Sequence, residues 1–405
     1  MANVSSSNGL EKHPKLRFPG FDEPWNESKL SACFAKNIKK NTDGSISNVI
    51  CNSAKMGLIP QRDYFDKDIA NSDNTSGYYI IERDDFVYNP RKSSDAPYGP
   101  ISRYTYSEAG IVSPLYLCFR AKGNVDSNFF EWYFRSSAWH RYIYMTGDSG
   151  ARHDRVSIKD TDFFAMPIRY PSTTEQEKIA SFLTAIEERI SSQQLLVDNL
   201  KKYKRGLLNS LITQKLKFTP GQIWRTTKLG DIFQERTERA IGDEELLAVT
   251  IRSGVQKRDE INLKDNSSDD KSHYKRVYKG DLVYNTMRMW QGASGVSLFD
   301  GIVSPAYTVV TPIDAAGTNI IFWSYYFKFV PLVRTFQKYS QGLTSDTWNL
   351  KFPQFSEIKV SVPSLKEQTS IADFLSRIDK KIQREENKLR ACQRLRTALM
   401  QQLFI

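Results

Sequence analysis

Clusters of basic and amide side chains are the residues of this chain whose types suit a specific chemistry. Arginine and lysine can bond the edge of guanine, asparagine and glutamine can bond the edge of adenine, and all four can bind phosphate. Any one such residue can equally be solvated surface, so the prediction of DNA contact rests on clusters. In the first half of the chain the candidates are Arg91, Lys92, Arg103, Tyr104, Arg152, His153 and Arg155. In the second half they are Arg252, Lys257, Arg258, Arg288, Gln291, Thr344, Ser345 and Trp348.

The charge balance of the chain points the same way. The 405 residues include 57 Lys and Arg against 46 Asp and Glu, which gives a formal net charge of +11. Such an excess favours an anionic partner, and nucleic acid is the first candidate. The alternative is a basic protein whose charge serves only solubility.

Cysteine and histidine usage predicts no metal site. The 4 cysteines form no CxxC pair, and the 4 histidines include no pair at metal-ligand spacing. The N-terminal stretch lacks the apolar core of a secretory signal, and the most apolar segment, 320–333, is interrupted by Lys328 and is too short for a membrane span. We therefore expect a cytoplasmic protein without a metal or a membrane partner.

An internal repeat reveals the elements that must position the candidate residues. Residues 171–211 read PSTTEQEKIASFLTAIEERISSQQLLVDNLKKYKRGLLNSL, and residues 363–403 read PSLKEQTSIADFLSRIDKKIQREENKLRACQRLRTALMQQL. The pattern returns after 192 positions, from Pro171 to Pro363. Upstream, FVYN at 86–89 matches LVYN at 282–285, and GIVSPLY matches GIVSPAY. A period of this length indicates a duplicated domain with its helix.

Each copy reads as strand-like segments followed by one long helix. The matched segments are rich in Val, Ile and Tyr and bounded by Gly, Pro and Asn, which predicts buried strands of an α+β domain with a mixed or mainly antiparallel sheet. We expect a flexible N-terminal extension at 1–15, a first domain at 16–170, its helix at 171–213, a linker at 214–223, a second domain at 224–362 and its helix at 363–405.

Both helical segments carry an apolar seam in steps of three and four, which is typical of a coiled coil. Polar residues interrupt the seam at matching places, Lys204 in one copy and Arg396 in the other. The linker is too short to travel far, so the second helix must run back along the first, and we predict an antiparallel pair with pseudo-two-fold symmetry. The seam residues are Ile179, Leu183, Ile186, Ile190, Val197, Leu200, Leu207, Leu211, Ile371, Leu375, Ile378, Ile382, Leu389, Leu399 and Leu403.

Two basic domains on a rigid helical spacer suit duplex DNA. Helices of about forty residues make a rod of ~60 Å, and sites on one face of B-DNA recur every ~34–36 Å. Because the two domains differ in sequence, the predicted target is bipartite and asymmetric, with an unread spacer. The alternative is a pair of domains joined by a purely structural stalk.

The repeated helices resemble those of a known family. PSTTEQEKIASFL and PSLKEQTSIADFL resemble the conserved-region helices of type I restriction-modification specificity subunits, and LRFPGFDEPW resembles the usual start of these subunits. TGDSGARHDRVSIKD and SQGLTSDTWNLKFPQ resemble the Gly-containing loop of that family before the last strand. The arrangement of two target-recognition domains, each followed by such a helix, is similar as well.

This resemblance implies a non-catalytic subunit that recognises double-stranded DNA. It also implies binding of two adenine-N6 methyltransferase subunits, which two ATP-dependent restriction subunits can join. S-adenosylmethionine, ATP and Mg would then belong to the partners, and this chain would hold no cofactor.

Three other hypotheses remain open. The chain contains no Gly-rich methyl-donor loop and no P-loop, yet a nuclease or methyltransferase relative with its own activity is one alternative. The others are a specificity subunit of a methylation-only complex and a coiled-coil interaction protein without DNA specificity. The third would show no preference among random duplexes.

Overall fold

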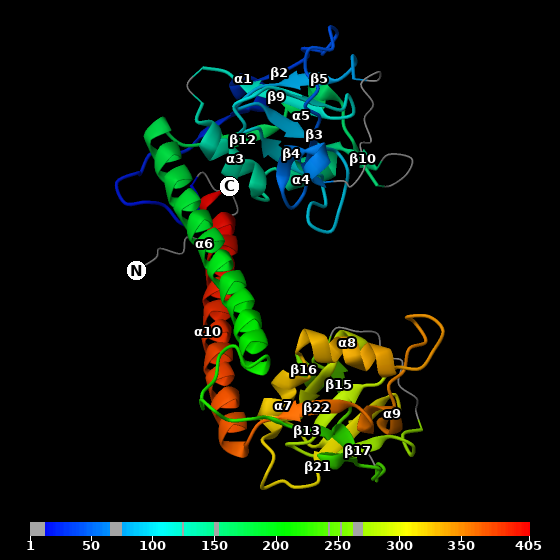
Figure 1. Ribbon diagram of the computed structural model, residues 1–405. Coiled ribbons are helices and arrows are strands. Elements are labelled where there is room, and N and C mark those ends of the chain that lie inside the picture. The colour runs from blue at the N-terminus through cyan, green and yellow to red at the C-terminus, as the bar shows by residue number, and fades with distance from the viewer. Residues whose placement is uncertain are drawn as a thin grey trace. The chain divides into compact units, whose positions relative to one another are not determined.

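The computed structural model describes residues 13–64, 75–123, 125–149, 154–241, 244–251, 253–261 and 270–405. Contacts divide the chain into two units (Figure 1). Unit 1 comprises Met1–Gln193 with Lys388–Ile405, and unit 2 comprises Gln194–Asn387. Each unit contains one α/β domain and a part of each long helix. Most of the predicted N-terminal extension, 1–12, lies outside the described residues.

The domain of unit 1 is built from short strands and short helices. A central antiparallel sheet has the order β2-β9-β6-β7, and two-stranded ribbons surround it. The elements are β1 (Asn26–Lys29), α1 (Leu30–Cys33), β2 (Phe34–Lys36), β3 (Ile50–Ser53), β4 (Gly57–Pro60), α2 (Gln61–Tyr64), β5 (Tyr79–Ile81), β6 (Phe86–Tyr88), β7 (Ile101–Arg103), β8 (Gly110–Val112), β9 (Leu117–Ala121), α3 (Ser127–Arg135), α4 (His140–Thr146), β10 (Asp148–Ser149), β11 (Val156–Ser157), α5 (Asp160–Phe164) and β12 (Pro167–Tyr170).

The domain of unit 2 repeats this order. Its central sheet, β14-β21-β18-β19, has the same antiparallel pairing. The elements are β13 (Arg225–Lys228), the 3-10 helix η2 (Leu229–Asp231), β14 (Phe233–Glu235), β15 (Leu247–Thr250), β16 (Gly254–Lys257), β17 (Lys275–Val277), β18 (Leu282–Asn285), the 3-10 helix η3 (Met289–Gln291), β19 (Ser294–Val296), β20 (Gly301–Val303), β21 (Tyr307–Pro312), α7 (Ile320–Tyr326), α8 (Val330–Tyr339), α9 (Phe352–Ser356) and β22 (Lys359–Val362).

The matched FVYN and LVYN segments form the central strands β6 and β18. Successive side chains of a strand point to opposite faces, so each strand joins two apolar clusters. Phe86 and Tyr88 lie in the cluster that contains α3, whereas Val87 lies in a second cluster with Ile81. In unit 2, Tyr284 and Val283 divide in the same way. The prediction of buried strands in a mainly antiparallel sheet is confirmed.

The two long helices are α6 (Thr173–Ile212) and α10 (Leu365–Leu403), and they lie side by side (Figure 1). Within unit 2, Lys201 of α6 pairs with Glu386 of α10, and Lys204 of α6 pairs with Asp379 of α10. The later residue of α6 thus pairs with the earlier residue of α10. The helices therefore run antiparallel. The fold predicted from the sequence, two tandem mixed α/β domains with paired long helices, is confirmed.

The seam residues lie on the buried side of this pair. The most buried are Ile179, Leu183, Ile190, Val197, Leu211, Ile371, Leu375, Ile382, Leu389, Leu399 and Leu403. Ile186, Leu200, Leu207 and Ile378 are partly buried. The polar interruptions make ion pairs: Lys204 Nζ lies 2.6 Å from Asp379 Oδ1, and Arg396 Nη1 lies 2.7 Å from Glu187 Oε2. These two pairs are equivalent under the 192-residue offset.

The repeated Glu-Gln dipeptide joins each long helix to its domain. Gln176 donates to the carbonyl of Pro171 and accepts from the backbone N–H of Asp126, which caps α3. Gln368 makes the same two bonds in unit 2, to Pro363 and to Asn319 before α7. Each glutamine thereby supplies a buried backbone carbonyl and a backbone N–H with a partner.

The preceding glutamate of each dipeptide is buried and held by a donor from upstream. Arg17 forms a bidentate ion pair with Glu175, at 2.8 Å for both contacts. Trp224 Nε1 donates to Glu367 at 3.3 Å. The Glu-Gln motif at the start of each long helix therefore has a structural role, since its side chains bond the helix to residues of the adjoining domain and, in unit 1, to Arg17.

A short strap before each domain lies along a long helix. KLRFPG at 15–20 matches KLKFTPG at 215–221. The backbone N–H of Leu16 donates to the carbonyl of Gln402, and that of Leu216 donates to the carbonyl of Ser210, both at 3.0 Å. Phe18 packs edge-on against Phe182, as Phe218 packs against Phe374. The repeat thus includes the strap as well as the domain and helix.

Candidate nucleic-acid interface

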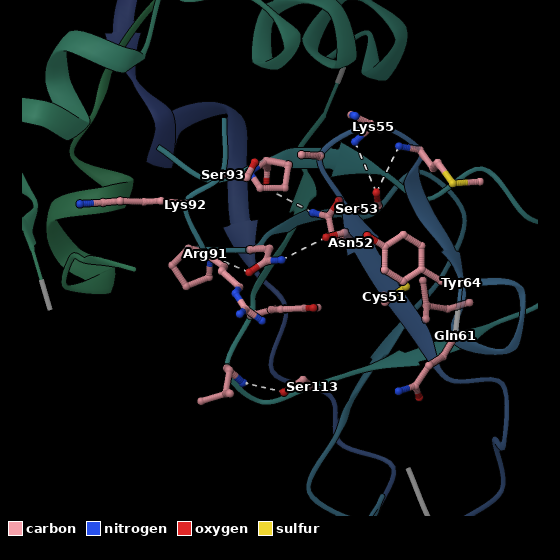
Figure 2. Close-up of a pocket in the computed structure, with 18 of the residues that line it drawn as sticks. Cys51, Asn52, Ser53, Lys55, Gln61, Tyr64, Arg91, Lys92, Ser93 and Ser113 are labelled. Atoms are coloured by element: carbon pink, nitrogen blue, oxygen red, sulfur yellow. Dashed lines mark hydrogen bonds between the residues drawn. The ribbon is translucent and has the colours of Figure 1, made fainter. Parts of the chain in front are cut away.

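A hollow of about 720 Å³ opens on the domain of unit 1. Its walls are the turn between β3 and β4, the short helix α2, and the loop that runs from β6 to β7. Figure 2 shows Lys55, Gln61 and Tyr64 on the β3–β4 and α2 side and Arg91 across from them. The rim thus combines cationic, amide and aromatic side chains, which are the types that bind phosphates and base edges.

The loop from β6 to β7 is held in one shape by Asn89. Its side chain donates to the carbonyl of Asn52 and accepts from the backbone N–H of Arg91. Gly99 closes the loop at φ +82°, where an added Cβ would lie 2.1 Å from the carbonyl oxygen of Asn89. Only glycine fits this approach. Asn285 repeats the second bond in unit 2 by accepting from the N–H of Met287.

The floor of the hollow is structural. Asn52 is buried and donates to the carbonyls of Val87 and Pro100, while Ser102 donates to its side-chain oxygen. Burial also raises the pKa of Tyr116, so this phenol stays neutral. The rim is the other part of the lining, and there Lys55 Nζ lies 3.6 Å from Asp95 Oδ2.

The structure brings two of the predicted basic clusters of unit 1 together. Arg91 and Arg155 face each other across a short antiparallel bridge, and the N–H of Lys92 donates to the carbonyl of Asp154. Arg91, Lys92 and Arg155 line the hollow, and the side chains of Arg91 and Arg155 are more exposed than that of Lys92 (Figure 2). The predicted Arg152 and His153 lie outside the described residues.

Arg103 and Tyr104 are not among the residues that line the hollow. Arg103 forms ion pairs with Asp84 and Glu131, both at 2.8 Å, and its side chain is 16% exposed. Tyr104 is completely buried and donates to the carbonyl of Glu108. Both side chains have partners inside the domain, and their contact with DNA stays a prediction.

In unit 2 a contact between two tryptophans joins the loop after β18 to the loop before α9. Trp290, in η3, meets Trp348 edge-on with ring centroids 5.2 Å apart. The N–H of Leu350 donates to the carbonyl of Thr286, which joins the same two loops. The predicted Arg288 and Gln291 are exposed on the first loop, and Thr344 and Ser345 are exposed on the second.

Of the remaining predicted residues of unit 2, Lys257 is the last residue of β16 and Arg258 directly follows it. Lys257 pairs with Glu245 at 2.9 Å and lies over the ring of Phe299. Arg258 follows directly and anchors its backbone N–H to the carbonyl of Leu246. Arg252 lies outside the described residues. Lys257 is therefore committed to a local ion pair, and Arg288 and Gln291 are the stronger candidates for DNA contact.

Four residues of these two loop regions are not among those predicted from the sequence: Lys55, Gln61, Tyr64 and Trp290. A signal was present, because the two hairpins align through Gly57 and Gly254, which share a left-handed backbone at φ +69° and +67°. In this register Gln61 takes the place of Arg258. A comparison of the hairpins would therefore have added the α2 segment to the candidates.

Comparison with known proteins assigns the class of this fold. Residues 222–392 match the family described as the type I restriction modification DNA specificity domain. The crystal structure of the type I restriction-modification system S subunit from M. genitalium matches 97% of this chain and 99% of that chain, with a TM-score of 0.57 and 14% identity. A structure from work on complex assembly and conformational transition of the type I R-M system matches 95% of this chain and 98% of that chain, with a TM-score of 0.56 and 14% identity.

The chain is thus a two-domain α/β protein with the fold of a type I specificity subunit. Residues 222–392 match the type I restriction modification DNA specificity domain, and the resemblance predicted from the sequence is confirmed. Within the described ranges, no helix is long and apolar enough to cross a membrane.

Proposed function

We propose that this chain is the DNA-specificity subunit of a type I restriction-modification complex. Unit 1 reads one half of a bipartite, asymmetric duplex site, and unit 2 reads the other. The observation that carries the proposal is that the two domains share their sheets and helix contacts but differ in their loops. The two domains share sheet order, strand pairing and helix fastening, yet their loops differ: Arg91 and Arg155 meet in unit 1, and Trp290 and Trp348 meet in unit 2.

In this proposal the chain is a recognition subunit rather than an enzyme. Its rim residues are suited to binding base edges and phosphates, and in unit 1 the side chains of Asn52 and Tyr88 donate to backbone carbonyls. Methyl transfer and DNA cleavage would fall to partner subunits, two methyltransferases and two restriction subunits, which would bring S-adenosylmethionine, ATP and Mg. The complex would work in the cytoplasm, where its DNA substrate lies.

The test is a map of methylated adenines across the genome of the host, with and without this gene. We expect a split motif with an unread spacer that disappears when the gene is deleted. A continuous palindrome would contradict the two-reader proposal. A motif that persists after deletion would show that another chain supplies the specificity.

A second experiment separates this proposal from an enzyme with its own activity. The purified chain, without partners, is incubated with duplex DNA, methyl donor and Mg. We expect binding without methylation or cleavage, and any turnover that co-purifies with the chain would overturn the non-catalytic role. Recovery of methylation without cleavage when methyltransferase subunits are added would be consistent with either a full or a methylation-only complex.

A further inference from the structure

Lys328 is a half-buried lysine between α7 and α8 whose ammonium group meets three backbone carbonyls. Its Nζ lies 2.5 Å from the oxygen of Gly292, 2.9 Å from that of Ser294 and 3.3 Å from that of Ile251. An ammonium group has three N–H donors and no acceptor. All three donors of Lys328 are therefore used within the domain.

The three carbonyls belong to two of the segments that carry or adjoin the candidate DNA contacts of unit 2. Ile251 lies in the turn between β15 and β16. Gly292 directly follows Gln291 and ends η3 with a left-handed backbone at φ +79°. The stem of Lys328 passes under this turn, with its Cδ 3.8 Å from the place where a Cβ on Gly292 would lie. One side chain thus ties both segments to the helical layer.

Burying the charged ammonium group of Lys328 costs free energy when the hydrogen bonds are left out of account. Burial lowers the pKa of Lys328 to about 8, and the nearby positive charge of Lys204 acts in the same direction. The recorded partners of the ammonium are carbonyl oxygens, which compensate by hydrogen bonding. A lysine that served only solubility would lie in water, where it carries no such cost.

In unit 1 an ion pair, rather than a lysine bonded to backbone carbonyls, joins α3 to the central sheet. The repeat places Ser137 at the position of Lys328, because Trp132 aligns with Trp323. Instead, Arg103 of β7 pairs with Glu131 of α3. The lysine contact is therefore a feature of unit 2 and not of the shared frame.

We propose that Lys328 is a positioning residue for the half-site read by unit 2. Its ammonium group fixes the β15–β16 turn and the loop after η3 in one arrangement, so that Arg288 and Gln291 meet the bases in a defined geometry. The inference rests on the proposed function, since it presumes that these loops read DNA. It predicts that loss of the ammonium group relaxes the sequence preference of one half-site only.

The experiment is a binding selection from random duplexes with the full-length chain and its variants. Arg288→Ala first identifies the half-site that unit 2 reads. Lys328→Met keeps the length of the side chain but removes the donors, and we expect the preference at that half-site to fall about tenfold, as for loss of one good base contact. Preference at the other half-site should stay within about twofold, since distant sites act independently. Lys328→Arg keeps the charge and donors and should retain most of the preference.

The matched control is Lys275→Met. Lys275 is also a half-buried lysine of unit 2, and it donates to Glu235 and to the carbonyl of Tyr307, away from the η3 loop. If Lys328→Met and Lys275→Met change the half-site preference equally, the positioning role is overturned. If Lys328→Met does not fold, Lys328→Gln, which retains two donors, must show an intermediate loss. A wild-type chain that selects no split site contradicts the proposed function instead.

Discussion

Asp85 and Arg120 form a bidentate ion pair in which the carboxylate is fully buried and the guanidinium is about half exposed. The contacts are 2.5 Å from Nε to Oδ1 and 2.8 Å from Nη2 to Oδ2. Asn37 adds a third donor to the same carboxylate. In unit 2 the equivalent Asp281 is held by Arg236, which occupies the position of Asn37, and the position of Arg120 is Thr311. The buried aspartate at this position of each domain is thus paired with an arginine from a different place, β9 in unit 1 and the residue directly after β14 in unit 2.

This exchange predicts a rescue. Arg120→Thr alone removes the partner of a buried carboxylate and should lower the free energy of unfolding by about 2–3 kcal/mol. Adding Asn37→Arg copies the arrangement of unit 2 and should restore most of the loss. Denaturant unfolding of the wild type, the single variant and the double variant measures both steps. A double variant no more stable than Arg120→Thr would show that the two positions are not interchangeable.

The pair of Lys204 and Asp379 predicts a salt-dependent contribution to helix pairing. Asp379 also accepts from the hydroxyl of Tyr325 at 2.6 Å, so both helices and α7 converge on one carboxylate. Lys204→Glu places like charges together and should destabilise by about 1–2 kcal/mol at low salt. At about 1 M salt the difference should shrink, because screening acts on partly exposed charges. Thermal unfolding at two salt concentrations tests this; equal losses at both would contradict an electrostatic origin.

The hollow of unit 1 predicts a division of labour between Arg91 and Gln61. Arg91→Ala should weaken binding to all duplexes and reduce the slope of log affinity against log salt by about 1, if its guanidinium meets phosphate. Gln61→Ala should leave that slope unchanged and cost about 1–3 kcal/mol only on the preferred half-site. Binding isotherms on specific and scrambled duplexes distinguish the two. Arg103→Ala serves as the control, since its ion pairs lie outside the hollow, and it should change stability rather than the salt slope.

The depressed pKa of Lys328 predicts a pH-dependent stability difference. Between the folded pKa of about 8 and the ordinary value of 10.5, the unfolded chain binds more protons at this residue than the folded chain does. Stability contributed by Lys328 therefore rises with pH across this window and is constant below it. Relative to Lys328→Met, the wild type should gain about 2 kcal/mol between pH 8 and 9.5. Guanidinium unfolding of both proteins at several pH values gives the difference, and a flat difference would contradict the shift.

The parts of the fold that follow from short-range patterns could be predicted from the sequence. The helix seam is visible because apolar residues at steps of three and four must share one face. The central strands are visible because Val87 and Val283 sit in matched apolar segments. The ion pairs of Arg103 could not be predicted, because its partners, Asp84 and Glu131, come from other elements and no local pattern indicates them. Gln61 was missed because its place on the rim depends on how the β3–β4 hairpin folds against a distant loop.

Each strap contacts the C-terminal end of a long helix, whether or not the chain connects the two directly. Leu16 bonds to Gln402 as Leu216 bonds to Ser210, although a continuous chain joins only the second pair closely. Helix, strap and domain therefore follow one another in space at both places, with a covalent path at one and hydrogen bonds and apolar packing at the other. The strap of unit 1 therefore stands to the end of α10 as the strap of unit 2 stands to the end of α6, and a peptide connection between strap and helix is not needed for this contact.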